Sequence, residues 1–161
     1  MMSIQTETRH AHSLSRPILL VEDNPMDIDF ALQAFEENKV INPVVICRDG
    51  EEALAFIAAH PAPDDLQLPA VVLLDLHLPK VDGSEVLRQA RLHPVWRVIP
   101  FVVLTTSRDS ADITHAYELG ANSYIVKPVN FDAFAEVIKT LKANWLLINE
   151  PPFAEAGRRP Q

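Results

Sequence analysis

The sequence predicts an α/β fold in which five parallel strands form one doubly wound (βα)5 sheet. Three observations support this prediction. Short aliphatic runs recur five times along the 161 residues, and a stretch with helical features follows each run. The third run, VVLL at residues 71–74, has no polar alternation, which is typical of a strand covered on both faces of a parallel sheet. Strands that alternate with helices pair in parallel, and right-handed crossovers then place helices on both faces.

Each element can be placed from its own residues. The strands are predicted at residues 18–21, 44–47, 71–74, 101–104 and 124–126. The helices are predicted to begin near residues 25, 50, 83, 109 and 131. Residues 60–69 hold three prolines and no periodicity, which indicates a surface loop between the second helix and the third strand.

Residues at the helix ends support these boundaries. Asn24 followed by Pro25 combines a preferred N-cap residue with proline at the first helical position. Asp49 and Glu52, three residues apart, match a capping box. Gly120 ends the fourth helical stretch and suits the left-handed position found there.

The length fits one domain flanked by two short tails. Residues 1–16 are polar and unpatterned, so we expect an N-terminal tail, followed by a domain at residues 17–148. Residues 149–161 are expected to form a C-terminal tail that is too short for an output domain. The output is therefore expected to be protein contact.

Composition excludes several classes of function. Lys and Arg total 14 against 22 Asp and Glu, which gives a net charge of −8 and a pI of about 5.1, so no nucleic-acid partner is expected. No stretch is apolar enough for a membrane span, and the N-terminal residues do not resemble a secretion signal, which favours a cytoplasmic protein. Cys47 is the only cysteine, so an internal disulfide is impossible.

Polar side chains follow four of the five predicted strands. They are Glu22 and Asp23 after the first strand, Asp75 after the third, Thr105 after the fourth and Lys127 after the fifth. Because the carboxyl ends of parallel strands meet at one edge of a sheet, we expect these five residues to lie together. Taken alone, Asp75 is more simply explained as a loop carboxylate that caps the next helix, and each of the others has a similarly plain structural explanation. Their shared position favours a site.

The five residue types suit phosphoryl transfer to a carboxylate. Three carboxylates repel one another and favour a cation, and an all-oxygen site suits Mg²⁺. Lys127 and Thr105 supply a positive charge and a hydroxyl group for phosphate oxygens. We expect Asp75 to be the nucleophile that attacks phosphorus in line, because it lies at the centre of the sheet.

These motifs, in this order, resemble the receiver domain of bacterial two-component response regulators. The resemblance covers about residues 17–147 and rests on LLVEDNP, LLDLHLP, VVLTTS and YIVKP. It implies a flavodoxin-like sheet in the order 2-1-3-4-5, and a signalling protein whose only chemistry is self-catalysed phosphotransfer and slow autodephosphorylation. The expected donor is a sensor histidine kinase.

The resemblance also assigns roles to individual residues. It implies that Mg²⁺ contacts Asp23, Asp75 and the backbone carbonyl of His77, with Glu22 acting through water. Thr105 and Tyr124 would form a conformational switch, in which the hydroxyl moves toward the phosphoryl group and the aromatic ring turns inward. The family also implies a cis bond before Pro128 in the KP motif.

A narrower resemblance concerns the kinase partner. DLHLPKVDG, LTTS and the C-terminal Trp145 are similar to the single-domain regulators that partner cyanobacterial and bacterial phytochromes. This implies that the histidine kinase is a phytochrome. His77 stands where those regulators often carry Asn.

The C-terminal end of the last helix is apolar around its whole circumference. Trp145, Leu146, Leu147 and Ile148 are consecutive and cannot all face one core. An exposed apolar patch usually marks a contact surface, so we expect a symmetric homodimer through the last strand and helix, with Trp145, Leu146 and Ile148 as interface candidates. The alternative is that this end folds back on its own domain.

Two other functions remain open from the sequence. A Mg²⁺-dependent phosphatase of the haloacid dehalogenase type also uses an Asp at the end of a strand, but it needs a second Asp where His77 stands. The other alternative is a receiver-like interaction module that never takes phosphate. A pure scaffold would not need Thr105 and Lys127.

Overall fold

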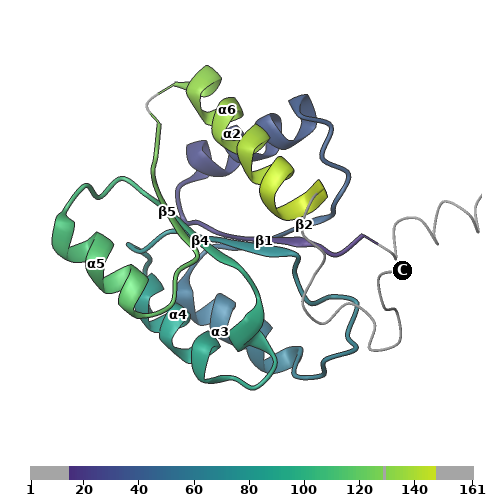
Figure 1. The fold of residues 1–161 in the computed structure, drawn as a ribbon, viewed down its shortest axis with the longest axis vertical. Coiled ribbons are helices and arrows are strands. Elements are labelled where there is room, and N and C mark those ends of the chain that lie inside the picture. Colours follow the sequence, from purple (N-terminus) through teal and green to yellow (C-terminus); the bar gives the residue numbers. More distant parts are fainter. Residues whose placement is uncertain (1–14, 129, 148–161) are drawn as a thin grey trace, which may run out of the picture.

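Five parallel strands form one sheet in the order β2-β1-β3-β4-β5 in the computed structural model, which describes residues 15–128 and 130–147 (Figure 1). The strands are β1 (Ile18–Val21), β2 (Val44–Cys47), β3 (Val71–Leu74), β4 (Phe101–Thr105) and β5 (Ser123–Val126). The predicted strand positions and the doubly wound order are confirmed, with one extra residue at the end of β4 and one at the start of β5.

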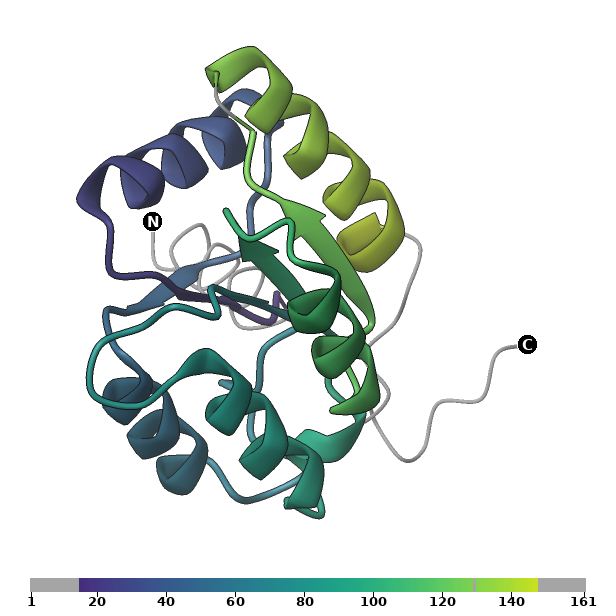
Figure 2. The ribbon, with the colours of Figure 1, turned by 90° about the vertical axis from the view of Figure 1, so that its left-hand side faces the viewer.

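Helices cover both faces of this sheet. They are α2 (Pro25–Glu37), α3 (Gly50–Ala59), α4 (Gly83–Leu92), α5 (Ser110–Glu118) and α6 (Phe131–Leu141). A 3₁₀ turn, η1 (Trp96–Val98), precedes β4, and a π-helical segment, η2 (Lys142–Leu147), continues α6. Figures 1 and 2 show α2 and α6 on one face and α3, α4 and α5 on the other. Within the described ranges no helix has the length and hydropathy needed to span a membrane.

The strand register aligns the carboxyl ends of the central strands. Val21 of β1 lies beside Leu74 of β3, which in turn lies beside Val103 of β4. Thr105 pairs with Val126 at the end of β5. The residues that come next in the chain therefore emerge at the same edge of the sheet.

The core consists of two layers separated by the sheet. Alternate residues of β1 and β3 face opposite layers: Leu20 and Leu73 pack toward α2 and α6, and Val21 and Leu74 pack toward α3 and α4. All eight residues of β1 and β3 are buried. This two-sided burial explains why the strand runs are uniformly aliphatic.

The helix caps predicted from the sequence are present, with one change. The side chain of Asn24 accepts a hydrogen bond from the backbone N–H of Met26 at 2.9 Å, and Asp49 accepts from that of Glu52 at 2.7 Å. The Glu52 carboxylate accepts from the N–H of Arg48 rather than that of Asp49, so the capping box is displaced by one residue.

Helices α2 and α6 are bound to each other although they lie at opposite ends of the domain sequence (Figure 2). The side-chain amide of Asn38 donates to the carbonyl oxygen of Ala135 at 3.1 Å. Lys142 Nζ donates to the carbonyl oxygen of Asn38 at 2.7 Å. Phe30 makes an edge contact with Phe134, with ring centroids 6.5 Å apart. Helices α2 and α6 thus form one layer.

Three local predictions were wrong. The Pro-rich stretch is not wholly at the surface, because Leu68 is fully buried within it. Helical spacing in the sequence puts Tyr117 on one face of the fourth helix with Ile113 and Ala116, but Tyr117 is half-exposed, and its hydroxyl accepts a hydrogen bond from the N–H of Tyr124. No peptide bond within the described ranges is cis, so the bond before Pro128 is trans, the form favoured by about 0.5–1 kcal/mol for most X–Pro bonds.

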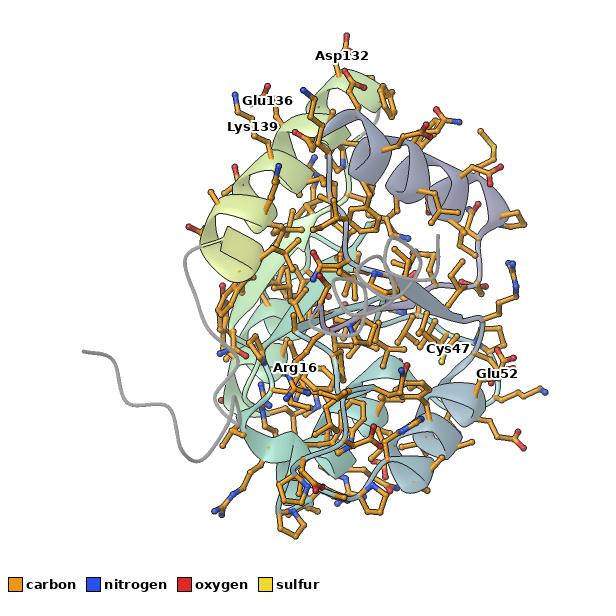
Figure 3. All side chains as sticks on the ribbon, turned by 90° about the vertical axis from the view of Figure 1, so that its right-hand side faces the viewer. Arg16, Cys47, Glu52, Asp132, Glu136 and Lys139 are labelled. Atoms are coloured by element: carbon orange, nitrogen blue, oxygen red, sulfur yellow. The ribbon has the colours of Figure 1, made fainter. Side chains whose placement is uncertain are left out.

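The apolar end of the last helix partly covers its own domain. Trp145 and Leu146 are half-buried and pack against the core cluster between the sheet, α2 and α6. This arrangement matches the alternative in which the segment folds back. Ile148, the third interface candidate, lies outside the described residues. The outer surface of α6 carries Asp132, Glu136 and Lys139, which point away from the domain (Figure 3).

Candidate functional site

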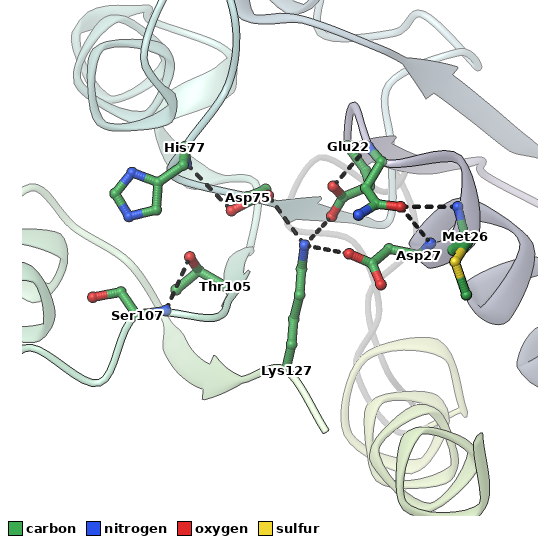
Figure 4. A network of polar contacts seen from close by, with 9 residues as sticks. Glu22, Met26, Asp27, Asp75, His77, Thr105, Ser107 and Lys127 are labelled. Atoms are coloured by element: carbon green, nitrogen blue, oxygen red, sulfur yellow. Dashed lines mark hydrogen bonds and ion pairs between the residues drawn. The ribbon is translucent and has the colours of Figure 1, made fainter. Parts of the chain in front are cut away.

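The Lys127 ammonium occupies the centre of a carboxylate cluster at the carboxyl edge of the sheet (Figure 4). Its Nζ atom lies 2.6 Å from Glu22 Oε2, 2.9 Å from Asp27 Oδ2 and 3.1 Å from Asp75 Oδ2. Glu22, Asp75 and Lys127 are each less than one tenth exposed. Buried charges at these distances interact strongly, because little water screens them.

Three of the predicted site residues form a group with the chemistry of a hard-cation site. Glu22, Asp23 and Asp75 each offer a carboxylate oxygen, and these oxygens lie within 4.8 Å of one another. Asp23 is exposed, whereas the other two are buried. Carboxylate oxygens with one solvent-facing member suit Mg²⁺, which usually keeps several water ligands. The residues present therefore fit a Mg²⁺ ion.

Burial shifts the protonation equilibria of this cluster. Burial raises the pKa of Glu22 to about 7; the hydrogen bond from Lys127 opposes the shift, and the charge of Asp75 adds to it. Burial alone would lower the pKa of Lys127, but its hydrogen bonds to Glu22 and Asp27 and the charge of Asp75 raise it above the usual lysine range. Lys127 is therefore a permanent cation at neutral pH.

Thr105 lies at the end of β4, beside the residue that precedes Lys127. It is fully buried, and its Oγ1 accepts a hydrogen bond from the N–H of Ser107 at 3.5 Å. The phenol of Tyr124 donates to the carbonyl oxygen of Ser107 at 3.0 Å. The two predicted switch residues therefore contact the same loop, residues 106–109, from two strands.

The loop after β3 fixes the orientation of Asp75. The backbone N–H of His77 donates to Asp75 Oδ1 at 3.2 Å, so the two oxygens of this carboxylate have different partners (Figure 4). The side chain of His77 is 63% exposed, with Nε2 3.9 Å from Asp112 Oδ2. A Cβ atom added at Gly83 would lie 2.1 Å from the carbonyl oxygen of Asp75, so only glycine fits where α4 begins.

The structure brings together all five residues predicted at the strand ends, and it adds Asp27. Asp27 is the third residue of α2, and from the sequence it resembles an ordinary acidic residue in the first turn of a helix. Its partner Lys127 is 100 residues away. Within the sequence alone, no local pattern connects the two.

This geometry suits attack by a carboxylate on phosphorus. One oxygen of Asp75 accepts a hydrogen bond from the backbone N–H of His77, and the other accepts one from the Lys127 ammonium. That ammonium can instead donate to an oxygen of an incoming phosphoryl group. The Thr105 hydroxyl group, at the end of the neighbouring strand β4, is a second hydrogen-bond donor for the incoming phosphoryl group. A bound Mg²⁺ would neutralise charge on the transferred oxygens.

Sequence comparison identifies relatives of similar length. The probable methanogenesis regulatory protein FilR2 from Methanothrix harundinacea is 42% identical over 135 residues, which cover 84% of this chain and 86% of FilR2. Response regulator Rcp1 from Synechocystis sp. is 36% identical over 129 residues, which cover 80% of this chain and 88% of Rcp1.

Solved structures show the same fold. The phosphorylated cyanobacterial phytochrome response regulator RcpA matches with a TM-score of 0.78 and 38% identity, covering 86% of this chain and 99% of RcpA. The Mn²⁺-bound form of Rcp1 matches with a TM-score of 0.75 and 34% identity, covering 85% of this chain and 99% of that structure. The first of these proteins is described as phosphorylated and the second as bound to Mn²⁺.

A family model agrees with these similarities over most of the chain. The model that matches is described as the response regulator receiver domain, and it covers residues 18–139, from the start of β1 into α6. The strand order and the acidic edge are those expected of the family from the sequence motifs. The chain belongs to the response regulator receiver domain family.

Proposed function

We propose that the protein accepts a phosphoryl group on Asp75 from a sensor histidine kinase and transmits the signal by a change of conformation. The observation that supports this most directly is the position of Asp75. It is buried at the end of the central strand, with the Lys127 ammonium 3.1 Å from one oxygen and the backbone N–H of His77 on the other. A carboxylate held in this way is oriented for attack.

In the proposed transfer, a carboxylate oxygen of Asp75 forms a bond to phosphorus as the bond to the imidazole nitrogen of the kinase breaks. The imidazole takes up a proton, and the product is an aspartyl phosphate. Lys127 and Thr105 bind the oxygens of the transferred group. Mg²⁺, the proposed cofactor, would be held by Glu22, Asp23 and Asp75 with the backbone carbonyl of His77, and it supplies charge neutralisation.

The phosphatase alternative receives no support from the site. That reaction needs an acid two residues after the nucleophile, and His77 at this position directs its ring toward Asp112, with Nε2 3.9 Å from the carboxylate. The interaction-module alternative predicts no covalent phosphate. It is therefore tested by the same experiment as the proposal.

The test is incubation of the full chain with acetyl phosphate and Mg²⁺, followed by intact-mass measurement. We expect the mass increase of one phosphoryl group, lost at high pH, and no increase in Asp75→Asn. Asp29→Asn makes the same chemical change on the exposed surface of α2 and should be phosphorylated like the wild type. An unchanged mass with acetyl phosphate and with cognate kinases would refute the phosphoacceptor role.

The proposed kinase is a phytochrome. The support is the similarity to RcpA, described as a phytochrome response regulator, over 86% of this chain. A transfer assay with autophosphorylated histidine kinases of the source organism, the phytochrome included, tests this. Fastest transfer from a different kinase would refute the phytochrome assignment and leave the phosphoacceptor role intact.

The proposed output is protein contact through β5 and α6, with homodimerisation as the form we favour. The exposed Asp132, Glu136 and Lys139 recur along the outer surface of α6, so this surface offers charges of both signs to a second copy. Trp145, Leu146 and Ile148 remain the apolar interface candidates. Sedimentation velocity at tens of micromolar, with and without phosphorylation, distinguishes the outcomes: a monomer in both states would refute dimerisation.

We propose a cytoplasmic location, in keeping with the proposed phosphoryl transfer from a sensor histidine kinase. Cys47, the only cysteine of the sequence, is buried, and burial raises the pKa of its thiol to about 11, so the thiol stays protonated at neutral pH.

A further inference from the structure

Asp27 occupies a position in the site that neither the motifs nor the metal cluster accounts for. Its Oδ2 lies 2.9 Å from Lys127 Nζ, and its side chain is 26% exposed. Three carboxylates contact Lys127 in the described structure, and Asp27 is the one that is not part of the group formed by Glu22, Asp23 and Asp75. Its role therefore needs a separate explanation.

A helix-capping role does not explain the orientation of Asp27. As the third residue of α2, it stands where the acid of a capping box would accept the N–H of the N-cap residue. Here the N–H of Asn24 donates to Glu22 Oε1 at 3.1 Å instead. The Asp27 carboxylate turns away from its own helix end and bonds to an ammonium group 100 residues further along the chain (Figure 4).

The ammonium group and a metal ion would compete for the same oxygens. Lys127 has three N–H donors, and Glu22, Asp27 and Asp75 provide three acceptors. A divalent cation at the acidic cluster would draw the carboxylates of Glu22 and Asp75 toward itself. Asp27 is then the carboxylate that stays with Lys127.

We propose that Asp27 is a positioning residue that keeps the Lys127 ammonium beside Asp75 while Glu22 and Asp75 turn to the metal. It thereby lowers the cost of metal binding and leaves the cation in place for the incoming phosphoryl group. The part of this inference that concerns metal binding rests on the acidic cluster alone. The part that concerns the incoming phosphoryl group rests on the proposed function.

The test compares Asp27→Asn with Asp29→Asn in the full chain. Both variants remove one negative charge from α2 without changing side-chain size, but Asp29 is exposed on the same helix. Mg²⁺ affinity, measured by calorimetry without any phosphoryl donor, should fall roughly tenfold in Asp27→Asn and less than about twofold in Asp29→Asn, because only Asp27 contacts the ammonium. Equal affinities in the two variants would overturn the inference.

A spectroscopic measurement separates positioning from a general effect on charge. The Nζ resonance of Lys127, assigned by its loss in Lys127→Arg, should remain that of a hydrogen-bonded ammonium when Mg²⁺ is added to the wild type. In Asp27→Asn, the addition of Mg²⁺ should move it toward the position of exposed lysines. A resonance that responds identically in the two proteins would refute the positioning role. Thermal unfolding of Asp27→Asn and Asp29→Asn confirms that the variants compared are folded.

Failure of this inference and failure of the proposed function give different results. If the wild type binds Mg²⁺ but takes no phosphoryl group, the phosphoacceptor role fails and the metal comparison still decides the role of Asp27. If the wild type is phosphorylated and Asp27→Asn matches Asp29→Asn in metal affinity and in the lysine resonance, the role of Asp27 fails alone.

Discussion

The phenol of Tyr124 donates a hydrogen bond to the carbonyl oxygen of Ser107, with the two oxygens 3.0 Å apart. This bond joins the edge strand β5 to the loop that follows Thr105. Burial raises the pKa of Tyr124, so the hydroxyl keeps its proton and acts as the donor at neutral pH. Tyr124, one of the two proposed switch residues, is therefore hydrogen-bonded to the loop that would have to move when Thr105 responds to phosphate.

Loss of this bond should cost a measurable part of the stability. We expect Tyr124→Phe to lower the free energy of unfolding by about 1 kcal/mol, since one partly buried hydrogen bond is removed and the ring is kept. Urea denaturation measures the change. Phosphorylation with acetyl phosphate should still occur, because the hydrogen bonds of Tyr124 are to Ser107 and Tyr117, away from Asp75. Unchanged stability would mean that the bond contributes nothing.

Substitution of Gly83 should disturb the site through the backbone. In Gly83→Ala the new Cβ would lie 2.1 Å from the carbonyl oxygen of Asp75 and 2.7 Å from Leu76 Cα, so the loop or the helix must shift. We expect a loss of about 3 kcal/mol in urea denaturation, as for other overpacked positions, together with weaker Mg²⁺ binding. Ser84→Ala, at the next residue, should change stability by no more than about 0.5 kcal/mol. A stable Gly83→Ala with normal Mg²⁺ affinity would contradict this packing.

Full stability of the fold should require an arginine at position 91. Its guanidinium donates to the carbonyl oxygens of Gly120 at 2.8 Å and Ile99 at 2.7 Å, and it lies 5.0 Å from the ring centroid of Phe101. A lysine cannot reproduce this planar set of donors, so Arg91→Lys should lower the free energy of unfolding by about 2–3 kcal/mol. Arg88→Lys, on the exposed surface of the same helix, should cost less than about 0.5 kcal/mol. Equal losses of stability in Arg91→Lys and Arg88→Lys would show that the hydrogen bonds of Arg91 do not require an arginine.

Metal affinity should depend on pH through Glu22. The pKa of this carboxyl group is raised to about 7 without metal, and a metal ion must displace the proton to bind the carboxylate. The apparent affinity for Mg²⁺ should therefore rise about tenfold between pH 6 and pH 8, and level off above pH 8. Calorimetry in buffers of different ionisation enthalpy should also detect the released proton. A flat profile between pH 6 and pH 8 would show that Glu22 is already ionised.

The sequence predicted the strands and the positions of the main candidate residues because both depend on simple rules. A strand buried on both faces has to be continuously aliphatic, as β1 and β3 are, so its limits can be read directly. A polar residue directly after such a strand must emerge at the carboxyl edge of the sheet. Asp75 was identified in this way after β3, and Lys127 by the same position after the partly buried β5, with no information about contacts.

The features that were missed depend on distant partners. Asp27 has the local pattern of a first-turn helix acid, and only the packing of β5 beside β4 brings Lys127 to it. Leu68 lies in a Pro-rich stretch without periodicity, so nothing local indicates that it fills the core. Tyr117 follows the helical spacing of α5, but α5 is short and buries little beyond Ala116.

The pairing of α2 with α6 affects how the chain can fold as it is synthesised. Asn38 binds Ala135 across 97 residues of sequence, so the side of α2 that faces α6 has no partner until nearly the whole domain has left the ribosome. The sheet face toward α3 and α4 can be covered earlier. A nascent chain that stalls before Phe131 would leave Phe30 without its two ring contacts on α6, and it should be a preferred substrate for chaperones and proteases until α6 emerges.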